Sequence, residues 1–284
     1  AGKSTLINTL IGEDRMMTGD LAGLTRESLE IEWEKNGQKY ILVDTPGQRR
    51  QAKVIEDLEQ MSVSTAKAAV RQAAVVILVI DVSEYAEDVG IDSVFHQQDI
   101  SIAQQILDAG RPLILLLNKW DQVHGKDKTA KILRDEIDYK LFDISNVTIL
   151  TTSGLTGKGI DKLLPNIQKV YQVWATKVST SKLNRLLEGI LMAKSPPLSK
   201  GQPVRLKYIS QVGICPPRFA VWGTRVNALP GSYKRFIMNQ LRDTLNLNGI
   251  PVRLDFKATT NPYAGKKSTG KKAEQLENKR KRKG

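Results

Sequence analysis

Two short, strongly apolar runs lie between segments of helical periodicity and narrow the choice of folds for this chain. The runs are AAVVILVI at residues 73–80 and PLILLL at residues 112–117. Both are far shorter than the roughly 20 residues that span a bilayer, so each predicts a buried strand. Buried strands separated by helices are typical of a mostly parallel sheet that is covered on both faces. The sequence therefore predicts a doubly wound α/β fold.

The rest of the first 175 residues also alternates between strand and helix patterns. We expect strands at residues 28–35, 39–47, 74–80, 113–117 and 147–151, and helices at residues 51–72, 92–109, 128–142 and 159–174. Asn36-Gly37 predicts a tight hairpin turn between the first two strands. Ligands bind at the carboxyl ends of the strands in such sheets. The polar residues Asp44, Asn118 and Ser153 each follow an apolar run and therefore mark a candidate site.

The pattern changes near residue 176. A helix, two alternating strands, a second helix and a last strand are expected at residues 179–194, 204–212, 218–225, 232–246 and 250–258. The final segment, GKKSTGKKAEQLENKRKRKG, has almost no apolar residues, which is typical of disorder. We therefore expect an α/β domain over residues 1–175, a small α+β domain over residues 176–264 and a basic disordered tail over residues 265–284.

The net charge of +13 is concentrated in the last third of the 284 residues. Residues 1–176 hold 20 Lys and Arg against 25 Asp and Glu, whereas residues 177–264 hold 14 against 3, a net charge of +11. An acidic half joined to a strongly basic half favours a polyanion as the partner of the basic half. Solvated faces, or the acidic surface of the first domain, would also account for some of these basic residues.

Cysteine use and the lack of long apolar runs bear on the compartment. The single cysteine, Cys215, excludes an internal disulfide framework and a cysteine metal cluster, and it fits a reducing cytoplasm. No charged-then-apolar leader opens the sequence. We therefore expect a cytoplasmic protein that has no membrane partner.

The chain opens with AGKST, in which Gly-Lys-Ser stands at the start of a helix-like segment. This is the back half of a phosphate-binding loop, whose leading strand and first glycine would precede residue 1. Backbone N–H groups of Gly2 and Thr5 would cradle phosphate at the helix start. Lys3 would contact the β- and γ-phosphates, and the Ser4 hydroxyl would ligate Mg²⁺. Taken alone, the tripeptide fits a solvated helix start equally well.

A second candidate stretch is DTPG at residues 44–47, at the end of an apolar strand. Asp44 would hold Mg²⁺ through a water molecule, and the Gly47 amide would bond the γ-phosphate. Thr45 belongs to the same nucleotide-binding turn. On its own, this stretch is explained better as a strand followed by a Pro-Gly turn.

The third stretch, NKWD at residues 118–121, is the most specific of the set. The Asp121 carboxylate can accept two parallel hydrogen bonds from the N1–H and 2-amino groups of guanine, a pair that adenine cannot offer. Asn118 can bond the base edge and the adjoining loop, while the stem of Lys119 lies over the ring. The alternative for this tetrapeptide is a solvated loop.

The fourth stretch is TTSGLTGKG at residues 151–159, which follows the last strand of the first domain. Backbone amides near Ser153 and Gly154 would contact the guanine oxygen, although a Gly-rich turn alone would read the same way. All four stretches fall in order along the chain, each at the end of a strand or in the loop that follows. Chance does not readily produce this order, so the sequence predicts a guanine nucleotide site.

These motifs resemble those of a translation-factor-class P-loop GTPase. The resemblance implies that Thr25, in GLTRES at residues 23–28, is the switch threonine that contacts Mg²⁺ and the γ-phosphate in the GTP state. It also implies catalytic roles for Lys3, Thr25 and Gly47. Gln48 either orients the attacking water or points into solvent.

A closer resemblance covers residues 1–264. The segments DTPGQRRQAKV, STSKLNRLLE, VRLKYISQV, CPPRFAVW, NALPGSYKRFIMNQLRDTL and GIPVRLDFKATTNP are similar to the double-GTPase family Der (EngA). The resemblance implies a second GTPase domain followed by a KH-like domain, with a further GTPase domain before residue 1. It also implies GTP hydrolysis coupled to assembly of the large ribosomal subunit through ribosomal RNA, and we expect a monomer.

Three features depart from that family's pattern. Gln48 stands where an apolar residue is usual, Ser153-Gly154 replaces the more common Ser-Ala, and residues 177–264 lack the G-x-x-G that clamps RNA in ordinary KH domains. The Asn that helps to bind an activating K⁺ in the family would fall one residue before Ala1, so K⁺ stays undecided as a cofactor. Open alternatives are an Era-like RNA-binding GTPase, a tRNA-modification GTPase and a non-enzymatic RNA-binding scaffold with a degenerate nucleotide domain.

Overall fold

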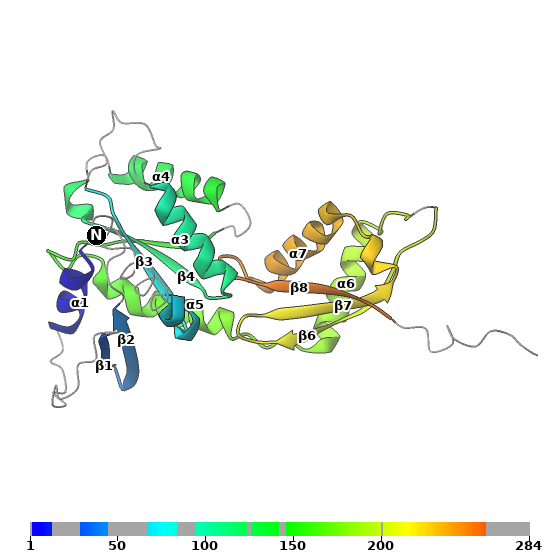
Figure 1. The fold of residues 1–284 in the computed structure, drawn as a ribbon, viewed down its shortest axis with the longest axis horizontal. Helices are drawn as coiled ribbons and strands as arrows, with labels where there is room; N and C mark the ends of the chain where they lie inside the picture. Colours follow the sequence, from blue (N-terminus) through cyan, green and yellow to red (C-terminus); the bar gives the residue numbers. More distant parts are fainter. Residues whose placement is uncertain are drawn as a thin grey trace, which may run out of the picture.

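The computed structural model describes two lobes, each built around its own sheet (Figure 1). The described residues are 2–12, 29–44, 67–83, 95–123, 126–141, 146–199 and 201–259. Among them, no helix is long and apolar enough to cross a membrane.

A parallel three-stranded sheet forms the centre of the first lobe. It contains β3 (Val76–Asp81), β4 (Leu113–Asn118) and β5 (Thr148–Thr151), in that order across the sheet. Every residue of β4 is buried, whereas β3 and β5 are mostly half-buried. The apolar run at 74–80 was expected to be buried, but only Ile80 is buried, whereas Ala74 is exposed and residues 75–79 are half-buried. These residues are half-buried because β3 lies at one edge of the described sheet.

Helices cover both faces of this sheet, as predicted. Leu113, Leu115 and Leu117 of β4 share one core cluster with α3 (Gln97–Asp108) and α4 (Lys126–Lys140). Ile114 and Leu116 point to the other face, where their clusters include α1 (Lys3–Gly12) and α5 (Leu163–Trp174). The switch of face with each residue is the two-residue period of a strand. A short 3-10 helix, η4 (Ile160–Lys162), leads into α5.

The hairpin predicted near the N-terminus is present. Strands β1 (Leu29–Lys35) and β2 (Gln38–Asp44) pair antiparallel, and Asn36 and Gly37 have φ values of 53° and 75°. Two consecutive positive φ angles are what a type I′ turn requires. Trp33 buries its ring in the cluster beneath α1. Of the helix expected at 51–72, residues 67–72 are helical and 51–66 lie outside the described residues, as do residues 45–47 of the second strand.

The second lobe has the predicted α-β-β-α-β order. Its elements are α6 (Thr180–Ala193), β6 (Arg205–Gly213), β7 (Arg218–Thr224), η5 (Val226–Ala228), α7 (Gly231–Leu245) and β8 (Arg253–Ala258). Strand β7 is central, antiparallel to β6 and parallel to β8. Both helices pack with the sheet in a single core cluster, which includes Leu183 and Ile237. The four residues spaced along α7 in the sequence are all buried: Tyr233, Ile237, Leu241 and Leu245.

The two lobes are in direct contact. The Arg253 guanidinium of β8 donates to the carbonyl of Asp108, at the C-terminal end of α3, at 3.0 Å. Ile250 joins the apolar cluster that contains Ile114. These contacts lie near the C-terminal end of α3 and the first residues of β4. The second lobe therefore sits at the end of the sheet opposite to the strands' carboxyl ends.

Gln211 of β6 holds the segment that connects the two lobes. Its side-chain oxygen accepts from the amide of Val178 at 2.8 Å, and its side-chain nitrogen donates to the carbonyl of Thr176 at 2.9 Å. Both groups of the side-chain amide are thus bonded to the connecting backbone. The connection between the lobes is therefore an ordered one.

Candidate nucleotide site

The candidate site is built where β3 and β4 end. Asp81 and Asn118 are the last residues of these strands and lie opposite each other in the parallel register. Helix α1 starts beside them, with Gly2 immediately before its first residue. The carboxyl ends of parallel strands and a helix N-terminus are thereby brought together, an arrangement that suits an anionic ligand.

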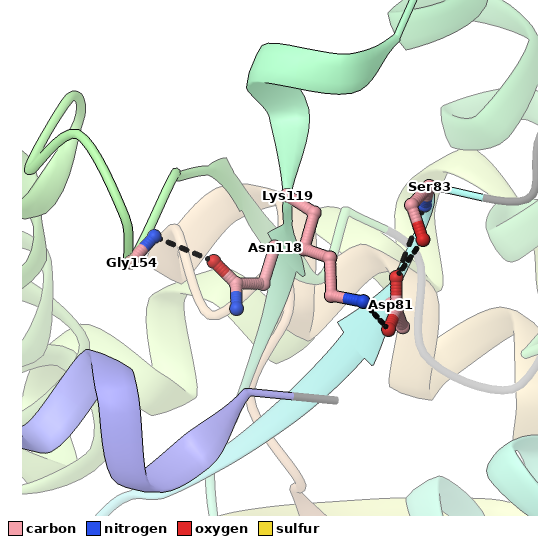
Figure 2. Close-up of polar contacts among 5 residues, drawn as sticks. All are labelled: Asp81, Ser83, Asn118, Lys119 and Gly154. Carbon is pink, nitrogen blue, oxygen red and sulfur yellow. Dashed lines mark hydrogen bonds and ion pairs between the residues drawn. The ribbon is translucent and has the colours of Figure 1, made fainter.

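Asn118 connects three of the motifs found in the sequence. Its side chain is only 2% exposed, and its oxygen accepts from the Gly154 amide at 3.0 Å and from the Thr152 hydroxyl at 3.5 Å. A Cβ added to Gly2 would lie 2.7 Å from the Asn118 side-chain nitrogen. Figure 2 shows the contact with Gly154. The AGKST, NKWD and TTSG segments therefore meet at one buried amide.

The Ser153–Gly154 loop is tied to the protein through both of its amides. The Ser153 amide donates to the carbonyl of Lys158 at 3.0 Å, and the Gly154 amide donates to Asn118. The Thr9 hydroxyl of α1 donates to the carbonyl of Gly154 at 2.7 Å. The loop therefore lies beside the other motifs, and both of its amides donate to acceptors within the protein. Contact between these amides and a guanine oxygen stays a prediction.

Gly154 packs closely against α1. A Cβ at this position would lie 3.3 Å from the backbone nitrogen of Leu6 and 3.4 Å from its Cα. An alanine here would need a small shift of the helix. Glycine therefore permits the observed closeness of loop and helix.

Lys119 and Asp81 form an ion pair beside Asn118 (Figure 2). Lys119 has a left-handed backbone with φ of 65°, and its ammonium lies 2.7 Å from a carboxylate oxygen of Asp81. The other Asp81 oxygen accepts from the Ser83 hydroxyl at 2.7 Å and from the Ser83 amide at 3.1 Å. Partial burial raises the pKa of Asp81, but the bonds from Lys119 and Ser83 outweigh it, so the pKa lies below its usual range. The carboxylate is therefore charged at neutral pH.

Asp81 was missed in the sequence analysis, although a signal for it exists. It is the first polar residue after the apolar run at 73–80, just as Asn118 follows PLILLL. Only the pairing register reveals that the two positions are neighbours. Asp81 does not belong to the four motifs, but it anchors the side chain of one of their members.

Asp121 lies in a short 3-10 helix, η3 (Trp120–Gln122), directly after Lys119. It is exposed, while the backbone of Trp120 is fixed because its amide donates to the carbonyl of Thr152 at 3.0 Å. An exposed carboxylate on an anchored turn is available to a ligand. This position suits the base-reading role that the sequence predicts.

The phosphate-loop residues occupy the start of α1. Gly2 has φ of 76°, and Lys3, Ser4 and Thr5 form the first turn of the helix, with Ser4 and Thr5 exposed. A positive φ favours glycine at that position. The exposed Ser4 hydroxyl is the kind of oxygen ligand that Mg²⁺ prefers, so this end of the helix fits the metal.

Thr25, Thr45, Gly47 and Gln48 lie outside the described residues, and of Asp44 only the main chain is described, at the end of β2. The structure therefore brings together the phosphate-loop, NKWD and TTSG segments. The two switch segments stay as sequence predictions.

We expect Asp81→Asn to weaken GDP binding by roughly 3- to 10-fold, because an unanchored Lys119 side chain must be ordered when the base binds. The change is measured on a form of the protein that includes the leading half of the phosphate loop. The exposed Asp135 on α4 offers a control with the same loss of charge, Asp135→Asn, which should leave the affinity unchanged.

The pH dependence follows from the lowered pKa of Asp81. A depressed carboxylate pKa means that the ion pair is fully present above the ordinary Asp pKa and is lost as the pH falls through the lowered value. GDP affinity should therefore show no step assignable to Asp81 between about pH 5 and 8. A step in that range that Asp81→Asn removes would contradict the assignment.

Two family models match this chain. Residues 1–119 match a 50S ribosome-binding GTPase, and residues 177–257 match the KH-domain-like C-terminal region of EngA bacterial GTPase enzymes. Among solved structures, Era in complex with MgGDPNP and nucleotides 1506–1542 of 16S ribosomal RNA is 22% identical, with a TM-score of 0.46 over 92% of this chain and 90% of that one.

Curated relatives are similar over most of the chain. GTPase Der of Parvibaculum lavamentivorans is 44% identical over 266 residues, which cover 94% of this chain and 54% of that protein. GTPase Der of Brucella ovis is 41% identical over 266 residues, covering 94% and 53% respectively. The chain thus spans about half the length of the curated relatives it matches. The GTPase match precedes the KH-like match along the chain, and the curated relatives that are 41–44% identical over 94% of this chain are both named GTPase Der. The chain therefore belongs to the Der (EngA) family of GTPases.

Proposed function

We propose that this chain binds guanine nucleotide at the candidate site and hydrolyses GTP as part of a molecular switch. The observation that carries the proposal is the buried side chain of Asn118, which contacts the Gly154 loop and lies against Gly2 at the start of α1. A single residue thereby holds the phosphate-binding end of a helix beside the predicted base-binding loops. Such rigid spacing suits a ligand that has a base at one end and phosphates at the other.

Hydrolysis of GTP requires positioning and charge neutralisation more than covalent chemistry. In the proposed site Lys3 neutralises charge on the β- and γ-phosphates, and backbone amides at the start of α1 hold their oxygens. Gly47 contacts the γ-phosphate, and Gln48 orients the attacking water. Asp121 selects guanine.

Mg²⁺ would be held by the hydroxyls of Ser4 and Thr25, with Asp44 contacting it through water. When bound, it would supply positive charge next to the β- and γ-phosphates. Ser4 and Thr25 offer the oxygen ligands that this metal requires. The protein's own part is to keep the hydroxyl of Ser4 exposed in the first turn of α1, next to the amides that hold phosphate.

The finer part of the proposal concerns the partner. We infer that the second lobe, acting within a monomer, binds ribosomal RNA during assembly of the large ribosomal subunit. Its net charge of +11 over residues 177–264 supports a polyanionic partner, and the basic tail at 265–284 would add salt-sensitive phosphate contacts. GTP would order the switch segments around Thr25 and Gly47 and thereby reposition this lobe on RNA.

Measured turnover tests the enzyme assignment. A form of the protein that includes the leading half of the phosphate loop should release phosphate from GTP in the presence of Mg²⁺, and Lys3→Ala should reduce the rate by at least about 100-fold, as for loss of other transition-state charge contacts. Phosphate release no faster than uncatalysed hydrolysis would favour the alternative of an RNA-binding scaffold with a degenerate nucleotide domain.

A further inference from the structure

Two aromatic rings are stacked face to face on the sheet of the second lobe. Tyr208 of β6 and Trp222 of β7 are cross-strand partners, with ring centroids 4.8 Å apart and planes only 11° from parallel. On the next strand, Lys257 is the register partner of Trp222, and its ammonium lies 5.8 Å from the indole centroid. Tyr208, Trp222 and Lys257 thus form a row across all three strands. We refer to them as the aromatic row.

The aromatic row lies on the face of the sheet that the helices leave open. The next residues along the strands, Ile209 and Val221, are completely buried in the cluster formed with α6 and α7. Side chains alternate between faces along a strand, so Tyr208 and Trp222 point to the opposite side. Tyr208 is 43% exposed and stands on β6, an edge strand of this sheet. The outermost ring of the row is therefore accessible.

The surroundings of the aromatic row are basic. Arg205 on β6 and Lys257 on β8 are both exposed, and they stand on the two edge strands of this sheet. Asp255, the carboxylate on β8, is paired with Arg218, whose guanidinium nitrogens lie 2.9 and 3.0 Å from one of its oxygens. The negative charge on this strand is therefore neutralised within the protein. An accessible aromatic ring with unbalanced positive charge around it is the combination that holds bases and phosphates of single-stranded nucleic acid.

We propose that the open face of the β6–β7–β8 sheet binds single-stranded RNA, with one base stacked on Tyr208 and the backbone phosphates contacted by Lys257 and Arg205. The inference rests on the RNA-binding part of the proposed function and assigns it a surface. An acidic protein would match the charge, but RNA also supplies the flat ring that extends the stack. The helix-covered side offers a second basic surface between α6 and α7, a shallow groove lined by Lys182, Arg185, Leu186 and Thr244. That groove has no aromatic lining.

Fluorescence anisotropy of a labelled oligouridylate of about 12 nucleotides tests the proposal on the full chain. Tyr208→Leu should weaken binding on the order of 10-fold, because it removes one stacking ring. Tyr208→Phe keeps the ring and should bind as the unaltered chain does. The Tyr208 side chain is substantially exposed, so both variants should fold, and their thermal unfolding curves check this point.

The salt dependence of binding separates stacking from charge. Tyr208→Leu should leave the slope of log K against log salt unchanged, whereas Lys257→Gln should reduce it by about 0.7, the value for one phosphate contact on a single strand. Lys182→Gln combined with Arg185→Gln is a control for the groove between α6 and α7. Any loss of RNA affinity that this double change causes should be the same whether position 208 holds tyrosine or leucine.

The outcomes distinguish this inference from the proposed function. If the chain binds the oligouridylate and Tyr208→Leu binds equally well, RNA is held elsewhere and the open face is not its site. If binding is lost only with the Lys182 and Arg185 changes, the groove is the RNA surface and the inference is wrong. If the unaltered chain binds no RNA, both the inference and the RNA part of the proposed function fail, while GTP turnover stands as a separate measurement.

Discussion

Replacing Asp121 by Asn is expected to move the base preference of the site from guanine to xanthine. The carboxylate of Asp121 accepts from both the N1–H and the 2-amino group of guanine, whereas an amide at this position would set its own N–H groups against the 2-amino group. Xanthine carries a carbonyl at C2, so the amide can donate to that oxygen and still accept from N1–H. The altered pairing is complementary again.

The loss in guanine affinity should be large. Two charge-assisted hydrogen bonds are removed and a donor is left facing a donor, so GDP affinity should fall on the order of 100- to 1,000-fold, or about 3–4 kcal/mol. Competition between GDP and XDP measures the change, on a form of the protein that includes the leading half of the phosphate loop. Gln122→Asn in the same exposed 3-10 helix is the matched control and should leave the preference for guanine intact. Unaltered preference in Asp121→Asn would overturn the base-reading assignment.

Much of the site was predictable because its residues occur in fixed local patterns. NKWD follows a fully buried strand and TTSG follows the next strand, so both segments had to reach the same edge of a parallel sheet. The burial of Asn118 could not be predicted in this way. Its role in joining two loops and a helix depends on contacts between segments far apart in the chain, including a hydrogen bond across 36 residues. Sequence spacing does not specify such contacts.

The sequence patterns predicted the strands but not the register in which they pair. Asp81 faces Asn118, and Tyr208 faces Trp222, only because of how the strands align. The β6–β7 pairing contains an irregularity between Leu206 and Tyr208, so counting residues along the strands would misplace the partners. Alternation predicted that these segments are strands, but a shift of one residue sends every side chain to the opposite face. The aromatic row was therefore visible only in three dimensions.

The sequence also does not show which glycines of the second lobe have room for a side chain. Gly223 of β7 and Gly189 of α6 are both set in regular elements, where glycine is normally unfavourable. Their surroundings differ completely. A Cβ at Gly223 would overlap the Arg205 carbonyl oxygen and lie 2.9 Å from a methyl carbon of Val226, whereas nothing lies within 4 Å of a Cβ at Gly189. The same substitution should therefore have opposite effects at the two positions.

Gly223→Ala is expected to destabilise the second lobe by about 3 kcal/mol, because the added methyl meets backbone on a central strand that is paired on both sides. Gly189→Ala should instead stabilise it by about 0.5–1 kcal/mol, the usual gain for alanine inside a helix. Urea unfolding followed by circular dichroism measures the change in the free energy of unfolding for both variants, which carry the same Gly→Ala substitution. Because Gly223 adjoins Trp222, its replacement should also disturb the stack with Tyr208 and weaken RNA binding, while Gly189→Ala leaves it intact. Equal stability of the two variants would mean that β7 moves away from β6 more easily than their paired backbones indicate.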